Sequence, residues 1–178
     1  MLKRIIFIIL IVIMSMTFLN SCSYFVDWRL KMLNSSDDAK KANARLEQVL
    51  EAIKNQDREA LKTMFSKQAL DEAKNIDDGL DYLFELFQGE VESWKNMNGE
   101  PSSAGTYEYG KKTRWEISAL YYVNTDKEKY FFFIKEYTVD NDNPDNVGMY
   151  TLLVMTEEEK RTQWSKLVND PPGIYMPR

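Results

Sequence analysis

The segment RWEISALYYV, residues 114–123, decides the fold because its apolar side chains recur at every second position. Alternation over this length predicts a β-strand with one face on a hydrophobic core. The predicted core face carries Trp115, Ile117, Ala119, Tyr121 and Val123, whereas Arg114, Glu116 and Ser118 lie on the opposite face.

This strand is followed by a predicted hairpin connection at residues 124–127 and a return strand at residues 130–139. The return strand begins with the run YFFFI, residues 130–134, which is apolar on both faces. A strand of that kind is normally covered on both sides. We expect helices on one face and either a partner chain or the C-terminal segment on the other, so a homodimer through the sheet is one predicted assembly.

Three helices are predicted before the strands. The first begins at residues 36–38, where a hydroxyl and two acids suit a helix N-terminus, and its core stripe is Leu46, Val49, Leu50 and Ile53. Asp57 is predicted to cap a second helix, whose buried positions are Leu61, Met64 and Phe65. The third is opened by Asp77 or Asp78, buries Leu80, Leu83, Phe84 and Phe87, and is closed by Gly89.

The remaining chain completes an antiparallel meander. We expect a short strand at residues 91–94, a loop at 98–103, an edge strand containing Tyr107 and Tyr109, a loop at 140–146 and a last strand at 149–155. Residues 157–167 form a helix or a turn, and regular structure ends at residues 170–173. Helices first and strands after them predict an α+β domain with the N-terminal helices packed on a curved antiparallel sheet.

Residues 46–66 add a resemblance to this pattern. Their sequence, with the helix end VLEAIKN at residues 49–55, then Asp57, Ala60-Leu61 and the triplet MFS at 64–66, resembles the opening of the nuclear transport factor 2-like (cystatin-like) cone. The resemblance implies a pocket between the helices and the curved sheet, and dimerisation through the sheet. It carries over no catalytic residue, because enzymes of that superfamily commonly use an Asp-His pair and this chain has no histidine.

The N-terminus has the layout of a secretory signal: Lys3 and Arg4, an apolar segment at residues 5–18, and Ser21 before Cys22. The apolar segment is short for a membrane span, which needs about 20 apolar residues. The sequence LNSC, residues 19–22, resembles the bacterial lipoprotein signal, although Asn20 departs from its usual Ala, Ser or Thr. The resemblance implies lipidation of Cys22 and cleavage before it, and the alternative is an uncleaved signal anchor or a cut elsewhere.

With this signal, the whole chain resembles uncharacterised exported lipoproteins of Gram-positive bacteria that carry a cone domain of unknown function. The predicted organisation is a signal peptide at residues 1–21, a lipidated N-terminus and tether at 22–35, and a single α+β cone domain at 36–178. The tether either lies at the level of the lipid headgroups or packs onto the domain. The expected location is the outer face of the bacterial cell membrane.

Composition excludes several classes of function. Loss of Lys3 and Arg4 with the signal leaves 21 basic residues against 28 acidic ones, which disfavours a nucleic-acid partner. The absence of histidine removes Ser-His and Cys-His nucleophile pairs and histidine-based metal sites. Cys22 is the only cysteine, so no intramolecular disulfide forms. No metal or other cofactor is expected.

Aromatic residues of the strands are the candidate ligand-binding set, because aromatic faces with phenol hydroxyls suit sugars, peptides and apolar rings. The set is Tyr107, Tyr109, Trp115, Tyr121, Tyr130, Phe132 and Tyr137. The alternative is that these residues are simply core.

Two further groups have a functional and a structural interpretation. Residues 140–146, DNDNPDN, carry the oxygen ligands that calcium prefers, but they lack the EF-hand spacing. A hairpin loop whose side chains bond its own backbone explains the same residues and is the favoured interpretation. Glu116, Lys135 and Glu136 are mid-strand charges: one that points inward would be a candidate acid or base, and otherwise they form a cross-strand ion pair.

These observations favour a non-catalytic, membrane-anchored domain that binds a small ligand or a protein partner through the cone pocket or the sheet. The alternative is a histidine-free enzyme of hydrolase or isomerase type that uses Asp, Glu and Tyr in the same pocket.

Overall fold

The computed structural model describes residues 37–164 and 171–176. The predictions for the signal peptide, Cys22 and the tether lie outside these residues, as does the end of the predicted segment at 157–167. The chain from Asp38 onward forms one compact unit. Among the described helices, none combines the length and apolar character that crossing a membrane requires.

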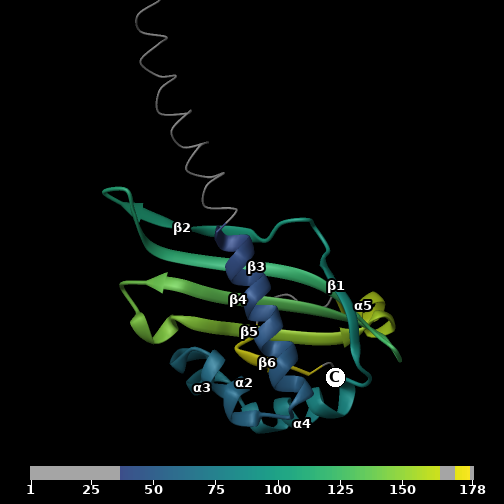
Figure 1. The fold of residues 1–178 in the computed structure, drawn as a ribbon. Coiled ribbons are helices and arrows are strands. Elements are labelled where there is room, and N and C mark those ends of the chain that lie inside the picture. The colour runs from purple at the N-terminus through teal and green to yellow at the C-terminus, as the bar shows by residue number, and fades with distance from the viewer. Residues whose placement is uncertain (1–36, 165–170, 177–178) are drawn as a thin grey trace, which may run out of the picture. The chain divides into compact units, whose positions relative to one another are not determined.

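The first helix, residues 37–54, lies across one face of the sheet (Figure 1). Its predicted stripe, Leu46, Val49, Leu50 and Ile53, is buried, because residues three and four apart share one side of a helix. Helix α2 (Arg58–Met64) follows, and the Asp57 carboxylate accepts a hydrogen bond from the Ala60 N–H, as the predicted cap requires.

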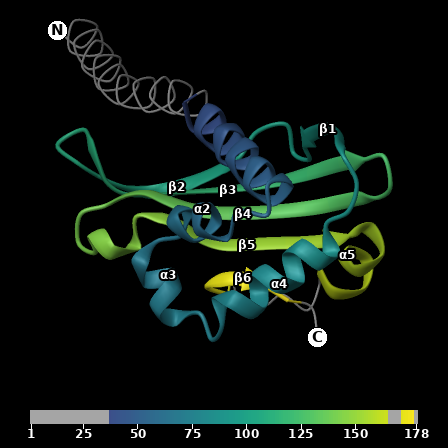
Figure 2. The same cartoon turned by 60° about the horizontal axis from the view of Figure 1, so that its bottom comes forward.

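Helices α3 (Lys67–Glu72) and α4 (Ile76–Leu86) lie beside the edge of the sheet formed by the last strand (Figure 2). Helix α3 was not predicted; Ser66 caps it by accepting from the Ala69 N–H at 3.0 Å. The predicted cap of α4 was wrong by two or three residues, because Asn75 accepts from the N–H groups of Asp77 and Asp78. Gly89 lies beyond the helix end at Phe87, with φ +91°.

The six-stranded sheet has the order β1-β3-β4-β5-β6, with β2 also paired to β3. Strands β1 (Val91–Asn96) and β2 (Ser102–Glu108) pair with opposite halves of the long β3 (Lys111–Thr125). Strands β4 (Lys129–Asp140) and β5 (Gly148–Thr156) continue the antiparallel order, with a short 3₁₀ turn, η1 (Pro144–Asn146), between them. The predicted α+β class is confirmed.

Two details of the predicted sheet were wrong. Regular structure does not end at Gly173, because β6 (Gly173–Tyr175) pairs with β5 in parallel and makes the sheet mixed. Tyr109 does not lie on an edge strand: it forms, with Gly110, the two-residue turn between β2 and β3.

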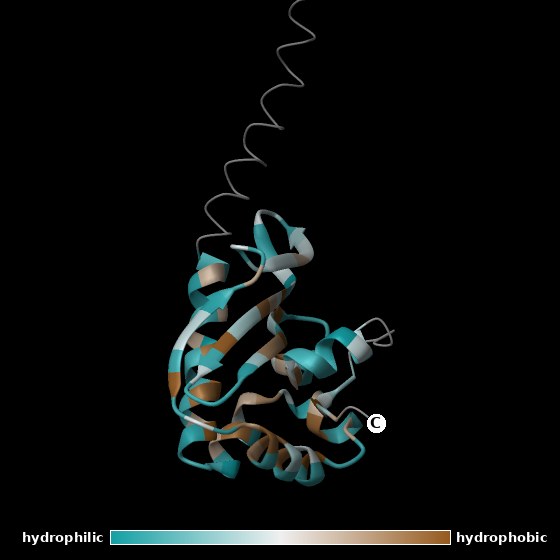
Figure 3. Cartoon of the chain, turned by 90° about the vertical axis from the view of Figure 1, so that its right-hand side faces the viewer, coloured by the Kyte–Doolittle hydropathy of each residue, from teal (hydrophilic) through white to brown (hydrophobic). Residues whose placement is uncertain are grey.

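The main core lies between the helices and one face of the sheet, where the hydrophobic positions gather (Figure 3). A smaller cluster of Phe131, Leu153 and Met155 lies on the other face. Helix α5 (Glu157–Gln163) and the Trp164 that follows it contact this second cluster, with the Phe131 and Trp164 ring centroids 4.9 Å apart. The two-sided apolar strand is therefore covered in part by the C-terminal segment, which is one of the two predicted arrangements.

Candidate functional site

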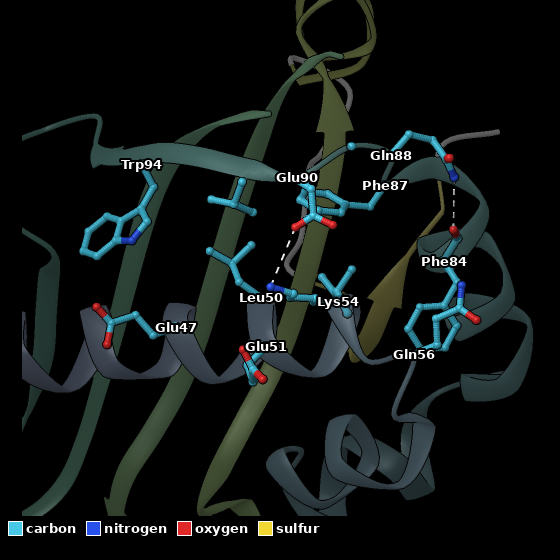
Figure 4. A pocket seen from close by; sticks show the side chains of 13 residues that line it. Glu47, Leu50, Glu51, Lys54, Gln56, Phe84, Phe87, Gln88, Glu90 and Trp94 are labelled. Carbon is cyan, nitrogen blue, oxygen red and sulfur yellow. Dashed lines mark hydrogen bonds and ion pairs between the residues drawn. The ribbon is translucent and has the colours of Figure 1, made fainter. Parts of the chain in front are cut away.

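A cleft of about 430 Å³ lies between the C-terminal half of the first helix, the end of α4 and the start of β1 (Figure 4). The first helix contributes one wall because its buried stripe packs on the sheet and its neighbouring polar positions face the opening. The opposite wall comes from the segment that leaves α4 and enters β1. The cleft is lined by Glu47, Leu50, Glu51, Ile53, Lys54, Gln56, Phe84, Phe87, Gln88, Gly89, Glu90, Val91 and Trp94.

Part of the cleft lining is apolar and aromatic. Leu50 and Phe87 are buried, whereas Phe84 and Trp94 are half-buried and Val91 is exposed. The Trp94 ring is held edge-on to Tyr121, at 5.7 Å between centroids. Partly covered aromatic rings beside a cavity offer apolar contact area to a bound molecule.

The rim of the cleft is acidic. Glu47, Glu51 and Glu90 contribute three carboxylates against the single ammonium of Lys54. Lys54 Nζ lies 3.7 Å from a Glu90 carboxylate oxygen, across the opening (Figure 4). Both side chains of this pair are mostly exposed, so the pair is weak and can open at little cost. The remaining carboxylates give the opening a negative potential.

The outer wall is fixed by hydrogen bonds to its backbone. Tyr130 Oη accepts from the Gln88 N–H at 2.9 Å and donates to the Leu86 carbonyl at 3.0 Å. The Asp126 carboxylate accepts from the Glu90 N–H at 2.7 Å. Glycine suits position 89 between them, because a Cβ there would clash with Asp126 Oδ1 and stand 2.8 Å from Thr125 Oγ1, and because the backbone has a positive φ. The wall that carries Phe87 and Glu90 is therefore preformed.

A second groove, of about 560 Å³, lies on the other side of the exposed ridge of the first helix, against α2. It shares Glu47 and Glu51 with the first cleft, and Asp57 adds another carboxylate. Ala44, Ala52 and Ala60 leave it shallow, and it contains no aromatic ring. The cleft beside α4 is the better candidate for binding an apolar group.

The predicted ligand-binding aromatics do not line either of these two clefts. Tyr121, Tyr130 and Phe132 are buried in the main core. Tyr121 Oη donates to Asn43 Oδ1 at 3.0 Å, and burial raises the pKa of its phenol to about 12, with the Glu136 charge acting in the same direction. These three residues support the cleft from behind: Tyr121 holds Trp94 and Tyr130 holds the outer wall.

The other four members of that set lie towards the opposite end of the sheet. Trp115 and Tyr137 are buried on different faces, and Tyr137 packs against Tyr150. Tyr107 is 44% exposed and stands edge-on to Trp115 at 5.2 Å, and burial followed by the Asp38 charge raises the pKa of its phenol. Tyr109 is fully exposed. The set is therefore not brought together around one cavity.

Asp38 is a buried carboxylate that the sequence did not single out as more than a helix-start acid. It is 1% exposed and accepts hydrogen bonds from Ser103 Oγ at 2.7 Å and Trp115 Nε1 at 2.8 Å. Lys112 Nζ stands 3.2 Å away and lies over the Trp115 ring. These contacts attach the beginning of the first helix to β2 and β3.

The mid-strand charges divide between the two predicted arrangements. Lys135 Nζ lies 3.6 Å from a Glu116 carboxylate oxygen, as a cross-strand ion pair. Glu136 points inward and is 5% exposed, with Arg45 Nε of the first helix donating to it at 2.9 Å. A buried carboxylate matched in this way joins helix to sheet, and it lines neither cleft.

Side chains of the loop at residues 140–146 form hydrogen bonds within the loop itself. The Asp140 carboxylate accepts from the Asn143 N–H at 3.0 Å and from Asn146 Nδ2 at 2.9 Å. Burial would raise the pKa of Asp140, but these bonds and the Arg114 charge outweigh it and hold the pKa below its usual range. Within the described residues no three acidic or sulfur side chains are grouped to hold a metal. The hydrogen bonds of Asp140 to Asn143 and Asn146 are those that the hairpin-loop interpretation predicts.

The cleft residues were missed because sequence patterns assign them to other roles. Phe84 and Phe87 have the spacing of core positions, and Trp94 falls on a short strand. The available signal was the helical spacing of Glu47, Glu51 and Lys54 beside the buried stripe, since positions four and three apart lie on one side of a helix. That signal predicts a charged ridge but not the cavity beside it.

The geometry defines an α+β domain in which helices lie on a curved mixed sheet. A cleft with aromatic lining and an acidic rim lies between the first helix, the end of α4 and the start of β1. The family model described as Domain of unknown function (DUF5104) matches residues 48–157, which is more than half of the chain. The protein belongs to this family. A search of curated proteins found nothing that matches the chain.

Proposed function

We propose that the domain binds a small ligand in the cleft beside α4. The observation that carries this proposal is a preformed cavity with a charged rim, lined by the half-buried rings of Trp94 and Phe84 towards its two ends (Figure 4). A ligand that covers either ring removes apolar surface from water, which is worth about 25 cal/mol for each Å² buried.

The charges of the rim indicate the kind of ligand. A bound anion would face Glu47, Glu51 and Glu90, whereas a cation would be attracted to them and would leave Lys54 free to turn outward. The favoured ligand therefore has an apolar or aromatic body and a positively charged group, such as an arylalkyl amine or a basic peptide side chain.

The enzyme alternative has weaker support. Acid or base catalysis at neutral pH favours a carboxylate that is shielded from water and lies in an open pocket beside a second polar group. The buried carboxylates of the described chain, Asp38, Glu136 and Asp140, are each engaged by hydrogen bonds and line neither cleft. The carboxylates that do line the cleft are exposed to solvent. Binding without chemistry is the simpler proposal.

We place this activity on the outer face of a bacterial membrane, with the chain held by lipid on Cys22. The support is the sequence LNSC at the end of an apolar segment and the use of the single cysteine at that position. Two or three acyl chains give stable attachment, at about 0.8 kcal/mol per buried CH₂. Mass spectrometry of the mature N-terminus decides between acylated Cys22 and an intact signal.

Two further proposals concern the superfamily of the fold and the oligomeric state. The nuclear transport factor 2-like cone is supported by helices that precede and cover a curved sheet. The homodimer through the sheet is supported by half-buried Leu120, Tyr122 and Phe133 on the face away from the first helix, although α5 covers part of that face. Light scattering of the purified protein measures whether it is a monomer or a dimer.

The binding proposal is tested by an NMR titration of residues 23–178 with phenylbutylamine. We expect the indole N–H resonance of Trp94 and the backbone resonances of Glu90 and Val91 to shift together and to saturate. The indole resonance of Trp115, at the other end of the sheet, serves as the internal control. Shifts spread evenly over both indoles, or no saturable shift, would reject the cleft as the binding site.

A further inference from the structure

In the turn between β2 and β3, Tyr109 has a backbone conformation that a tyrosine rarely adopts. Tyr109 and Gly110 have φ values of +49° and +78°, and the closing pair is Glu108 and Lys111. Two successive residues with positive φ are typical of a type I′ hairpin turn, in which Asn-Gly is preferred. An aromatic side chain in the left-handed region is costly, by roughly 1 kcal/mol or more.

The Tyr109 side chain is fully exposed on the folded domain. Its relative exposure is 104%, the largest among the exposed hydrophobic residues of the described chain. No hydrogen bond, ring contact or cation–π contact joins it to any other described residue. A strained and fully exposed aromatic residue at a hairpin tip points to a partner outside the domain.

The position of the tip limits what that partner is. Asp38, at the start of the first helix, is bonded to Ser103 of β2 and to Lys112 of β3, the residue after the closing pair. Only 15 residues lie between Cys22 and Asp38, and a segment of that length spans at most about 55 Å. Through Lys112 and Trp115, Asp38 therefore lies against the half of β3 that leads to the tip.

We propose that the tip formed by Tyr109, Gly110 and Lys111 contacts the headgroup region of the membrane that holds Cys22. This inference rests on the proposed lipidation of Cys22. Tyrosine is enriched at the membrane–water interface, where its ring and hydroxyl meet different environments. A single hairpin tip is also small compared with the roughly 800 Å² that each partner buries in a standard protein interface.

The charges around the tip indicate that the contact depends on the ring and not on anionic lipid. Glu108 and Lys111 are both exposed and balance each other, and Lys112 is engaged by Asp38. The contact orients the domain on the membrane, because the lipid fixes one point and the tip fixes a second. We therefore expect equal contact with neutral and anionic vesicles.

The test uses the full lipidated chain in phosphatidylcholine vesicles. Acylation of Cys22 leaves an introduced cysteine as the only thiol, so Lys111→Cys is labelled with an environment-sensitive fluorophore, and Lys127→Cys in the exposed β3–β4 turn is the matched control. We expect lipids with a headgroup nitroxide to quench the label at residue 111 severalfold more than the label at 127. Adding Tyr109→Asn removes this difference, while the melting temperature stays equal or rises.

Three results would overturn the proposal. Equal quenching at residues 111 and 127 in a chain that floats with the vesicles rejects the tip contact alone. Unchanged quenching after Tyr109→Asn shows that the tyrosine is not responsible. A chain that does not float, with an unmodified Cys22 by mass spectrometry, rejects both the lipid anchor and the oriented contact.

Discussion

Single buried polar residues connect the first helix to the sheet in this protein. Asp38, Asn43 and Arg45 of the helix meet Trp115, Tyr121 and Glu136 of the strands. Each polar atom that leaves water at this interface needs a partner, because an unsatisfied buried group costs about 1–3 kcal/mol. The polar contacts therefore determine where the helix lies on an otherwise apolar surface.

Replacement of Tyr121 by Phe tests the buried phenol. At neutral pH, Tyr121→Phe is expected to cost about 1 kcal/mol, because the hydrogen bond to Asn43 is lost. The pKa of Tyr121 is about 12 when folded, against an ordinary value of 10.0, so the folded state holds this proton more tightly. The stability that results is complete below pH 10 and is lost as the pH rises through 12.

Urea denaturation at a series of alkaline pH values measures this effect. The free energy of unfolding of the wild type should fall more steeply between pH 10 and 12 than that of Tyr121→Phe, by on the order of 2 kcal/mol over the interval. Lysines also titrate in this range, but they are common to both proteins, so the difference isolates Tyr121. Parallel curves would show that the phenol is not shielded from water.

Asp38 provides a second prediction for a single residue. Asp38→Asn removes the charge that faces Lys112 and exchanges one acceptor for a donor beside Trp115 Nε1, so we expect a loss of roughly 2–4 kcal/mol. The control Glu85→Gln, on the exposed side of α4, should change stability by less than about 0.5 kcal/mol. Thermal unfolding of the two variants compares them directly, and equal losses would contradict a structural role for the Asp38 cluster.

Among the structural elements, those with a strong local period could be predicted from sequence and those defined by tertiary contacts could not. The alternation from Trp115 to Val123 and the stripe of the first helix are visible because burial selects every second or every third and fourth residue. Helix α3 has only six residues, too few for a period, and is held by the Ser66 cap. Strand β6 forms by pairing with the edge of β5. The Pro-Pro-Gly sequence before it is typical of a loop, so the sequence does not predict a strand there.

The contact between α3 and β5 gives a prediction for these elements. The Ser66 N–H donates to the Met149 carbonyl at 2.9 Å, and Gly148 has φ +128° with space for no side chain, since a Cβ would stand 2.8 Å from Ser66 N. Gly148→Ala should therefore destabilise the domain by more than the roughly 1 kcal/mol expected from backbone strain alone.

Gly99 supplies the matched control. It also has a positive φ, of +81°, but nothing lies within 4 Å of a Cβ built there. Gly99→Ala measures the strain without the steric contact, and the difference between the two variants in urea denaturation isolates the α3–β5 junction. If Gly99→Ala were the more damaging change, the close approach of Ser66 to Gly148 would be wrong.

For the whole molecule, the sequence predicts the layers and, through the family resemblance, a pocket between them, but not which residues line that pocket. Aromatic residues of the strands are buried because the helices cover them, which explains why Tyr121, Tyr130 and Phe132 are core and not lining. The cleft arises where the first helix and the end of α4 diverge in front of β1, and that angle depends on Gly89, Asp126 and Tyr130 acting across the chain. Such contacts between distant segments leave no local pattern.

The charge preference of the cleft is the central functional claim. Phenylbutylamine and phenylbutyrate share an apolar body and differ in the sign of their charge. The ratio of their dissociation constants therefore measures the charge preference of the rim. The double variant Glu47→Gln/Glu90→Gln removes two of the three rim carboxylates and leaves the apolar lining intact.

Isothermal titration of both compounds into the wild type and the double variant gives that ratio. We predict that the wild type binds the amine at least about tenfold more tightly than the acid, which corresponds to about 1.4 kcal/mol, and that the double variant loses most of this preference. Equal affinities for the two compounds in the wild type, or a preference that survives in the variant, would contradict a cleft that selects cationic ligands.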